Sequence, residues 1–168
     1  MLRKVNKMKV RNRGFEKVSI DEFTKYYSSA LYEEVIMPKR KTTNSAGYDF
    51  HLITDLELHP NEEKIIPTAI KAYMQDDEYL QIVVRSSLGF KYNIRLKNQI
   101  GIIDSDYYNN PDNEGHILVS IKNEGNQILK LKKGDAFVQG IFQKYLVVDD
   151  EERPLKLRQG GIGSTQKL

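Results

Sequence analysis

Short apolar segments, each followed by a cluster of turn-forming residues, recur along this chain and restrict the folds open to it. Such segments, closed by Asn, Asp, Gly or Pro, are typical of β-strands separated by tight turns. The best candidates are residues 64–74, 79–85, 117–122 and 136–148. Because 168 residues is the length of one domain, this pattern predicts an all-β fold, a jelly-roll-like β-sandwich or barrel.

The best helical pattern covers residues 20–31. Ser19 and Glu22 have the spacing of a capping box, and the apolar side chains that follow, including Phe23 and Leu31, recur with a helical period. We therefore expect one short helix near the N-terminus.

The expected organisation has three parts. A basic, Tyr-rich extension over residues 1–34 holds the helix, a β domain covers 35–150, and a flexible C-terminal arm over 151–168 carries a glycine-rich motif. The first 18 residues contain seven basic side chains against one Glu. Two interpretations of that basic segment stay open, a solvated arm or a contact with phosphate or an acidic partner.

Composition excludes several classes of function. The net charge is only +3, which gives no case for nucleic-acid binding by the whole chain. The absence of cysteine excludes disulfides, thiolate zinc sites and a cysteine nucleophile. Neither an N-terminal signal peptide nor an apolar run of membrane-spanning length is visible. We expect a soluble, cytoplasmic protein with no membrane or nucleic-acid partner.

The segment 101–107, GIIDSDY, carries the clearest candidate chemistry. Asp104 and Asp106 follow an apolar run, and in an extended chain both point to the same side. A carboxylate at the end of a strand can orient a water as a general base, and Tyr107 places a ring beside it. By itself, Asp-x-Asp is also typical of a polar turn.

Two other motifs carry polar side chains suited to binding a ligand. Arg85 offers a fork of donors for phosphate oxygens, and Ser86 and Ser87 add hydroxyls next to it. Asn98 supplies both a hydrogen-bond acceptor and donors. The alternatives stay open: a strand-end turn with a surface salt bridge, and a turn-forming Asn.

Five segments in this order resemble the five motifs of the trimeric dUTP diphosphatases (dUTPases) of the bacterial and phage type. They are 45–49 (SAGYD), 85–89 (RSSLG), 98–107, 134–139 (GDAFVQ) and 160–165 (GGIGST). The resemblance implies hydrolysis of dUTP to dUMP and pyrophosphate, which keeps uracil out of DNA and supplies dUMP for thymidylate synthesis. It also implies a homotrimer with shared active sites. Mg²⁺ would be held mainly by the substrate phosphates, with no direct protein ligand.

The resemblance also implies roles for individual residues. Asp104 is the general base, a hairpin from Asn98 to Asp104 reads uracil, and Tyr107 lies against the deoxyribose and leaves no room for a 2′-hydroxyl. Arg85 and its two serines hold the triphosphate. The full set of expected substrate-binding residues is Arg85, Ser86, Ser87, Asn98, Gly101, Ile103, Tyr107, His116, Gln139, Arg158, Gly161, Gly163, Ser164 and Thr165.

The chain departs from the family pattern at several points. Ile162 stands where a Phe commonly stacks on uracil, and the segment 109–115 is an insertion after the third motif. We hypothesise that His116, or else Tyr108, replaces the missing ring. Ala136 stands where an Arg is usual. Arg158, to which the resemblance gives a phosphate role, lies one residue nearer to the glycines than is common.

Two other functions remain alternatives to dUTP hydrolysis. The dCTP deaminases share the fold and an Arg-Ser-Ser element, although the Glu that they need in the base pocket has no matching motif here. Phage-type relatives can act as nucleotide-gated partners of a regulatory protein, and this chain has an extension and an insertion that such a role could use.

Overall fold

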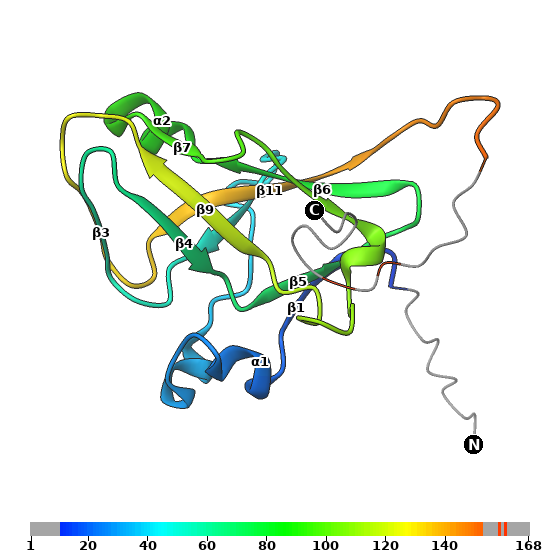
Figure 1. Cartoon of the computed structure of the whole chain (residues 1–168), viewed down its shortest axis with the longest axis horizontal. Helices are drawn as coiled ribbons and strands as arrows, with labels where there is room; N and C mark the ends of the chain where they lie inside the picture. The colour runs from blue at the N-terminus through cyan, green and yellow to red at the C-terminus, as the bar shows by residue number, and fades with distance from the viewer. Residues whose placement is uncertain (1–10, 153–157, 159, 161–168) are drawn as a thin grey trace, which may run out of the picture.

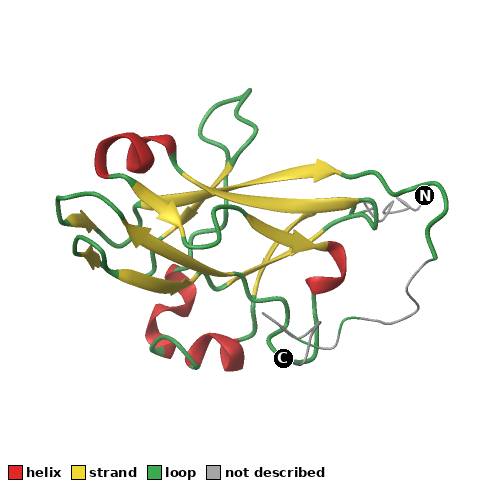
Figure 2. Ribbon diagram, turned by 45° about the horizontal axis from the view of Figure 1, so that its top comes forward, coloured by secondary structure: helices red, strands yellow, loops and turns green. Residues whose placement is uncertain are grey.

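The structure is a computed structural model that describes residues 11–152, 158 and 160. Its main layers are two antiparallel sheets that face each other (Figures 1 and 2). The first has the order β2, β11, β6, β8, with bounds Tyr48–His51, Ala136–Lys144, Glu78–Val84 and Gly101–Asp104. The second has the order β4, β9, β7, with bounds Glu63–Pro67, Leu118–Asn123 and Ile94–Leu96. The predicted all-β, jelly-roll-like fold is confirmed.

Two short strand pairs complete the β structure. β1 (Gly14–Lys17) pairs with β5 (Ile70–Tyr73), and β3 (Leu56–Leu58) pairs with β10 (Leu129–Leu131), both antiparallel. The first pair joins the N-terminal segment to the rest of the domain (Figure 1).

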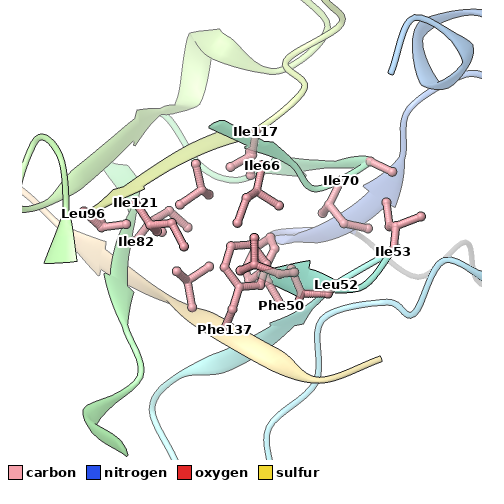
Figure 3. Packing of buried hydrophobic residues seen from close by; sticks show 14 of the residues in the cluster. Phe50, Leu52, Ile53, Ile66, Ile70, Ile82, Leu96, Ile117, Ile121 and Phe137 are labelled. Carbon is pink, nitrogen blue, oxygen red and sulfur yellow. The ribbon is translucent and has the colours of Figure 1, made fainter. Parts of the chain in front are cut away.

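The core lies between the sheets and follows from the two-residue period of their strands. Along β6 and β9, buried residues alternate with partly exposed ones, as expected when one face of each strand packs inward. Figure 3 shows Phe50 and Phe137 at the centre of the cluster, with Ile82, Ile121 and other aliphatic side chains around them.

The predicted strands are found, with two changes of boundary. Residues 79–85 and 117–122 correspond to β6 and β9, and 136–148 ends at Lys144 as β11. The segment 64–74 is not one strand, because Ala69 has a left-handed φ of 60° between β4 and β5. Its N–H donates to the imidazole Nε2 of His116 at 2.9 Å, a long-range contact that supports this conformation.

The helix predicted at residues 20–31 begins where expected, but the α-helix is shorter than predicted. α1 covers Ile20–Thr24, with Ser19 Oγ accepting the Glu22 N–H at 3.1 Å, and a 3₁₀ helix, η1, covers Ser29–Glu34. The expected capping box is completed by another residue, since Glu114 accepts the Ser19 N–H at 2.9 Å. A second α-helix, α2 (Ser86–Tyr92), was not predicted, and it ends at Asn93 in the left-handed region with a φ of 52°.

The N-terminal segment packs into the β domain. Val18 and Phe23 are fully buried, and the Val18 N–H donates to Ala69 O at 3.0 Å. Three described basic residues of this segment form ion pairs within the chain: Arg11 with Glu16, Arg13 with Glu78 and Lys17 with Glu33. Residues 14–34 therefore belong to the same hydrophobic core as the strands. Among the described residues, no helix has the length and apolar character needed to cross a membrane.

His116 and Glu22 form a buried polar pair beneath this segment. His116 is 0% exposed and Glu22 is 2% exposed, with Nδ1 and Oε1 3.0 Å apart. Because His116 Nε2 accepts the Ala69 N–H, the imidazole is neutral and carries its proton on Nδ1. Burial lowers the pKa of His116 below its ordinary value of 6.5, although Glu22 acts in the opposite direction.

This pair predicts a loss of stability in mild acid. Above pH 6.5 His116 is neutral in both the folded and unfolded states. Below that pH His116 binds a proton more readily in the unfolded chain than in the folded chain. The free energy of unfolding therefore falls by up to about 1.4 kcal/mol per pH unit for this residue. Burial also lowers the pKa of His51, which adds an effect of the same sign.

Urea unfolding at pH 7.5 and pH 5.5, at one protein concentration, measures this effect. We expect His116→Gln to lower the stability at pH 7.5 and to reduce its difference between the two pH values. The control His59→Gln removes an imidazole that is 57% exposed and should leave that difference unchanged. Equal pH dependence in wild type and His116→Gln would contradict the assignment.

Candidate active site

A pocket of about 700 Å³ opens where the chain crosses from one sheet to the other. β7 pairs with β9 and β8 pairs with β6, so the segment from Asn98 to Asp104 crosses between the sheets and is not the hairpin that the family resemblance implied. The predicted site residues that line this pocket are Asn98, Gly101, Ile103, Asp104, Tyr107 and Arg158. The crossing thus brings together the predicted base-binding residues and the predicted general base.

Asp104 stands at the end of β8, at the rim of the pocket. Its carboxylate is 50% exposed and accepts from Arg158 Nη2 at 2.6 Å. A 3₁₀ turn over Ser105–Tyr107 follows, and Asp106 accepts from Arg158 Nε at 2.9 Å. The two carboxylates therefore share one guanidinium, a function that sequence reasoning had not given to Asp106.

Tyr107 forms part of the pocket wall with a ring that is only 6% exposed. Its hydroxyl donates to the carbonyl of His116 at 3.0 Å and accepts from Asn113 Nδ2 at 2.9 Å. Burial raises the pKa of this phenol, so it stays protonated and able to donate. The Arg158 guanidinium lies 5.6 Å from the centre of the ring.

Gly101 allows two strands to meet closely at the pocket. A Cβ built there would lie 3.0 Å from the Cβ of Ile82, which is also a lining residue. A side chain at this position would crowd Ile82, so the glycine allows the close approach of β8 and β6 at the pocket.

A second cluster of predicted residues lies at the other end of β6. Arg85 follows this strand, with its Nε 3.2 Å from Asp49 Oδ1 and its Nη1 3.3 Å from the carbonyl of Ala136. Ser86 and Ser87 are exposed and begin α2. The carboxylate of Asp49 fixes the direction of the guanidinium, a function not predicted from the SAGYD motif.

Gln139 belongs to this second cluster. It lies on β11 opposite Asp49 of β2 and Val83 of β6. A Cβ at Gly47 would come within 2.2 Å of Gln139 Oε1, so glycine is required for this side chain to lie where it does. The motif 45–49 therefore supplies both the space beside Gln139 and the partner of Arg85.

The two clusters are far apart within one chain. Asp104 pairs with Tyr79 near the start of β6, whereas Arg85 follows Val84 at its end. Six residues of extended chain separate these levels, which is about 20 Å along the strand. Among the described residues, the pocket lining includes neither Arg85 nor Gln139.

The hypothesis that His116 covers the base is wrong. Its side chain is fully buried, and both ring nitrogens are engaged, by Glu22 and by the Ala69 N–H. Tyr108, the second candidate, donates its hydroxyl to Glu16 and packs its ring against Tyr73. The remaining predicted residues of the arm, Gly161, Gly163, Ser164 and Thr165, lie outside the described residues.

Comparisons with known proteins identify the family of the chain. The dUTPase family model matches residues 33–166. A deoxyuridine 5′-triphosphate nucleotidohydrolase of Lactococcus lactis subsp. lactis (strain IL1403) is 44% identical over 154 residues, which cover 91% of this chain and 97% of that protein. A relative of the same name from Haemophilus influenzae (strain PittEE) is 33% identical over 151 residues, covering 85% of this chain and 95% of that protein.

Solved structures give the same result. The crystal structure of a dUTPase from Streptococcus mutans has a TM-score of 0.66 and 40% identity, and the match covers 81% of this chain and 98% of that chain. These comparisons favour neither the dCTP deaminase nor the regulatory alternative. With a family model matched over most of its length and a relative 44% identical along nearly all of it, the chain belongs to the dUTPase family.

Proposed function

We propose that this dUTPase-family enzyme hydrolyses dUTP to dUMP and pyrophosphate, with Asp104 as the general base. The observation that carries the proposal is the position of Asp104, at the rim of a pocket that also contains Asn98 and Tyr107. A half-exposed carboxylate at that point can accept a proton from a water while the nucleotide occupies the pocket. The water then attacks the α-phosphorus, and pyrophosphate leaves.

Recognition of the nucleoside follows from the lining of the pocket. Asn98, together with backbone groups near Gly101 and Ile103, would form the hydrogen bonds that distinguish uracil from other bases. The ring of Tyr107 would lie against the deoxyribose and exclude a 2′-hydroxyl by its volume. A base whose edge does not match leaves buried polar groups unpaired, which is a strong source of specificity.

Binding of the phosphates requires a second copy of the chain. Arg85, Ser86, Ser87 and Gln139 have the donors for a triphosphate. In one chain, however, Arg85 lies about 20 Å along the sheet from the level of Asp104, and Gln139, which is opposite Val83, lies about 13 Å from it. One nucleotide cannot contact both groups of residues in the same copy. We therefore propose a homotrimer in which the pocket of one subunit faces the Arg85 cluster of another.

Arg158 would connect substrate binding to the base. Its guanidinium binds both Asp104 and Asp106 in the structure. A phosphate chain offers oxygens of higher charge, and we propose that Arg158 turns to it and leaves Asp104 accessible to water. The glycines and hydroxyls at 161, 163, 164 and 165 would add donors around the same phosphates.

Mg²⁺ is the proposed cofactor. In the part of the chain that the structure describes, no group of three or more His, Asp or Glu side chains is arranged to hold a metal ion. Since Mg²⁺ prefers oxygen ligands and retains water, the substrate phosphates would hold it. Its contribution when bound is to neutralise the triphosphate. Because the substrate belongs to the nucleotide pool, we also propose a cytoplasmic location.

Replacement of Asp104 tests the base. We expect wild type to release pyrophosphate from dUTP with Mg²⁺ much faster than from dCTP, dTTP or UTP. Asp104→Asn keeps the size of the side chain and removes its basicity, and should lower kcat by roughly 10²- to 10⁴-fold. Asp76→Asn changes an exposed acid of the turn before β6 and serves as the control. Unchanged activity in Asp104→Asn would exclude this residue as the base.

Mixed trimers test the shared site. Asp104→Asn and Arg85→Ala should each be inactive alone, and co-refolding them in equal amounts should restore about a quarter of the sites, because two chains contribute to each site. In the matched control, Asp104→Asn is mixed with Asn98→Ala, which affects the same pocket. That mixture should recover no activity. No recovery in the first mixture, with trimers shown to exchange subunits, would contradict sharing between these two clusters.

A further inference from the structure

We propose that Asn113, in the inserted loop, is a positioning residue that holds Tyr107 in place and so sets the preference for deoxyribose over ribose. The inference deepens the proposed function, since it depends on Tyr107 facing the sugar. It assigns a role to the insertion 109–115, which lies between Tyr108 and His116, the two residues suspected of covering the base.

Asn113 binds the hydroxyl of Tyr107 directly. Its Nδ2 donates to this hydroxyl at 2.9 Å, and the hydroxyl donates in turn to the His116 carbonyl at 3.0 Å. The amide of Asn113 is itself held, because Oδ1 accepts from Asn110 Nδ2 at 2.8 Å and from the Gly115 N–H at 3.1 Å. The hydroxyl of Tyr107 thus has two partners at fixed positions, the Asn113 amide as donor and the His116 carbonyl as acceptor.

Asn110 holds the backbone of Tyr107. It is 4% exposed, and its Nδ2 also donates to the Tyr107 carbonyl at 2.8 Å. Its Oδ1 accepts the Asn113 N–H at 3.2 Å, which fixes the backbone that carries the Asn113 amide. The loop therefore restrains Tyr107 at its backbone and at its hydroxyl, with the ring between them.

The loop is anchored to the N-terminal segment and to β5. Glu114 accepts the Ser19 N–H at 2.9 Å, and Lys71 donates to Asn109 Oδ1 at 2.7 Å. At the end of the loop the buried His116 binds Glu22. These contacts make the loop a fixed support, so a hydrogen bond from it can define a position for the ring.

The consequence for specificity is steric. A ring excludes a 2′-hydroxyl only while it cannot move away from the sugar, and a shift of about 1 Å is enough to change reactivity substantially. If the hydroxyl of Tyr107 loses its partners, the ring gains the freedom to admit ribose. We expect this loss to affect UTP more than dUTP, since dUTP needs no additional space.

The test compares kcat/KM for dUTP and UTP in the full-length enzyme with Mg²⁺. Tyr107→Phe keeps the ring and removes its hydroxyl, and Asn113→Ala removes the partner. Each variant should lower the dUTP-to-UTP ratio of kcat/KM by about tenfold. In the Tyr107→Phe background, Asn113→Ala should add less than about a twofold effect, because both substitutions remove the same interaction.

Pro111→Ala is the matched control. Pro111 is an exposed residue of the same loop, whereas the hydrogen bonds from this loop to Tyr107 come from Asn110 and Asn113. This variant should keep the wild-type ratio. If Asn113→Ala does not fold, Asn113→Asp replaces it, because aspartate keeps the Oδ1 acceptor and removes the Nδ2 donor to Tyr107.

Several results would overturn the inference. The first is an unchanged ratio in Tyr107→Phe while dUTP is still hydrolysed, and the second is full additivity of the two substitutions. A wild-type enzyme that hydrolyses dUTP and UTP equally would overturn the sugar-facing role of Tyr107 and this inference with it. Absence of dUTP hydrolysis in wild type would instead reject the proposed function from which the inference starts.

Discussion

The buried imidazole of His116 links the parts of the chain on which the site depends. Its two nitrogens join α1, through Glu22, to the bend at Ala69 that separates β4 from β5. Its carbonyl accepts the hydroxyl of Tyr107 in the pocket wall. A neutral, fully buried histidine can do this because each of its polar atoms has a partner, so its burial costs little. The N-terminal extension and the insertion are thus joined by hydrogen bonds, and together they hold Tyr107 in the wall of the pocket.

Local sequence patterns predicted the parts of the fold that depend on local chemistry. Residues 79–85 and 117–122 alternate along strands with one buried face, and the structure contains them as β6 and β9. The segment 64–74 has the same composition but bends at Ala69, whose left-handed backbone depends on the distant His116. α2 was missed because its seven residues include a glycine and are too few to show a helical period. The bend at Ala69 depends on a tertiary contact with His116, which leaves no periodic signal.

The candidate site shows the same limit. Motifs identified Asp104, Asn98 and Arg85, because the chemistry of each side chain can be read from its type. They did not reveal that these residues form two clusters at opposite ends of β6, since that depends on strand register. His116 was misjudged because a polar residue next to an insertion suggests an exposed position, whereas its ring is buried against Glu22, 94 residues away, and the Ala69 N–H. Burial of a polar residue is predictable only when its partner is known.

Each cationic side chain of the proposed site is already neutralised within its own chain. Arg85 is paired with Asp49, and Arg158 with Asp104 and Asp106. These pairs hold the guanidinium groups in defined directions without substrate. A triphosphate would have to compete with carboxylates for them, and its higher charge favours this exchange. The exchange at Arg158 also has a chemical consequence, since it releases the carboxylate that must bind a water. Under the proposed function, Asp104 would become available as a base once the phosphates have bound Arg158.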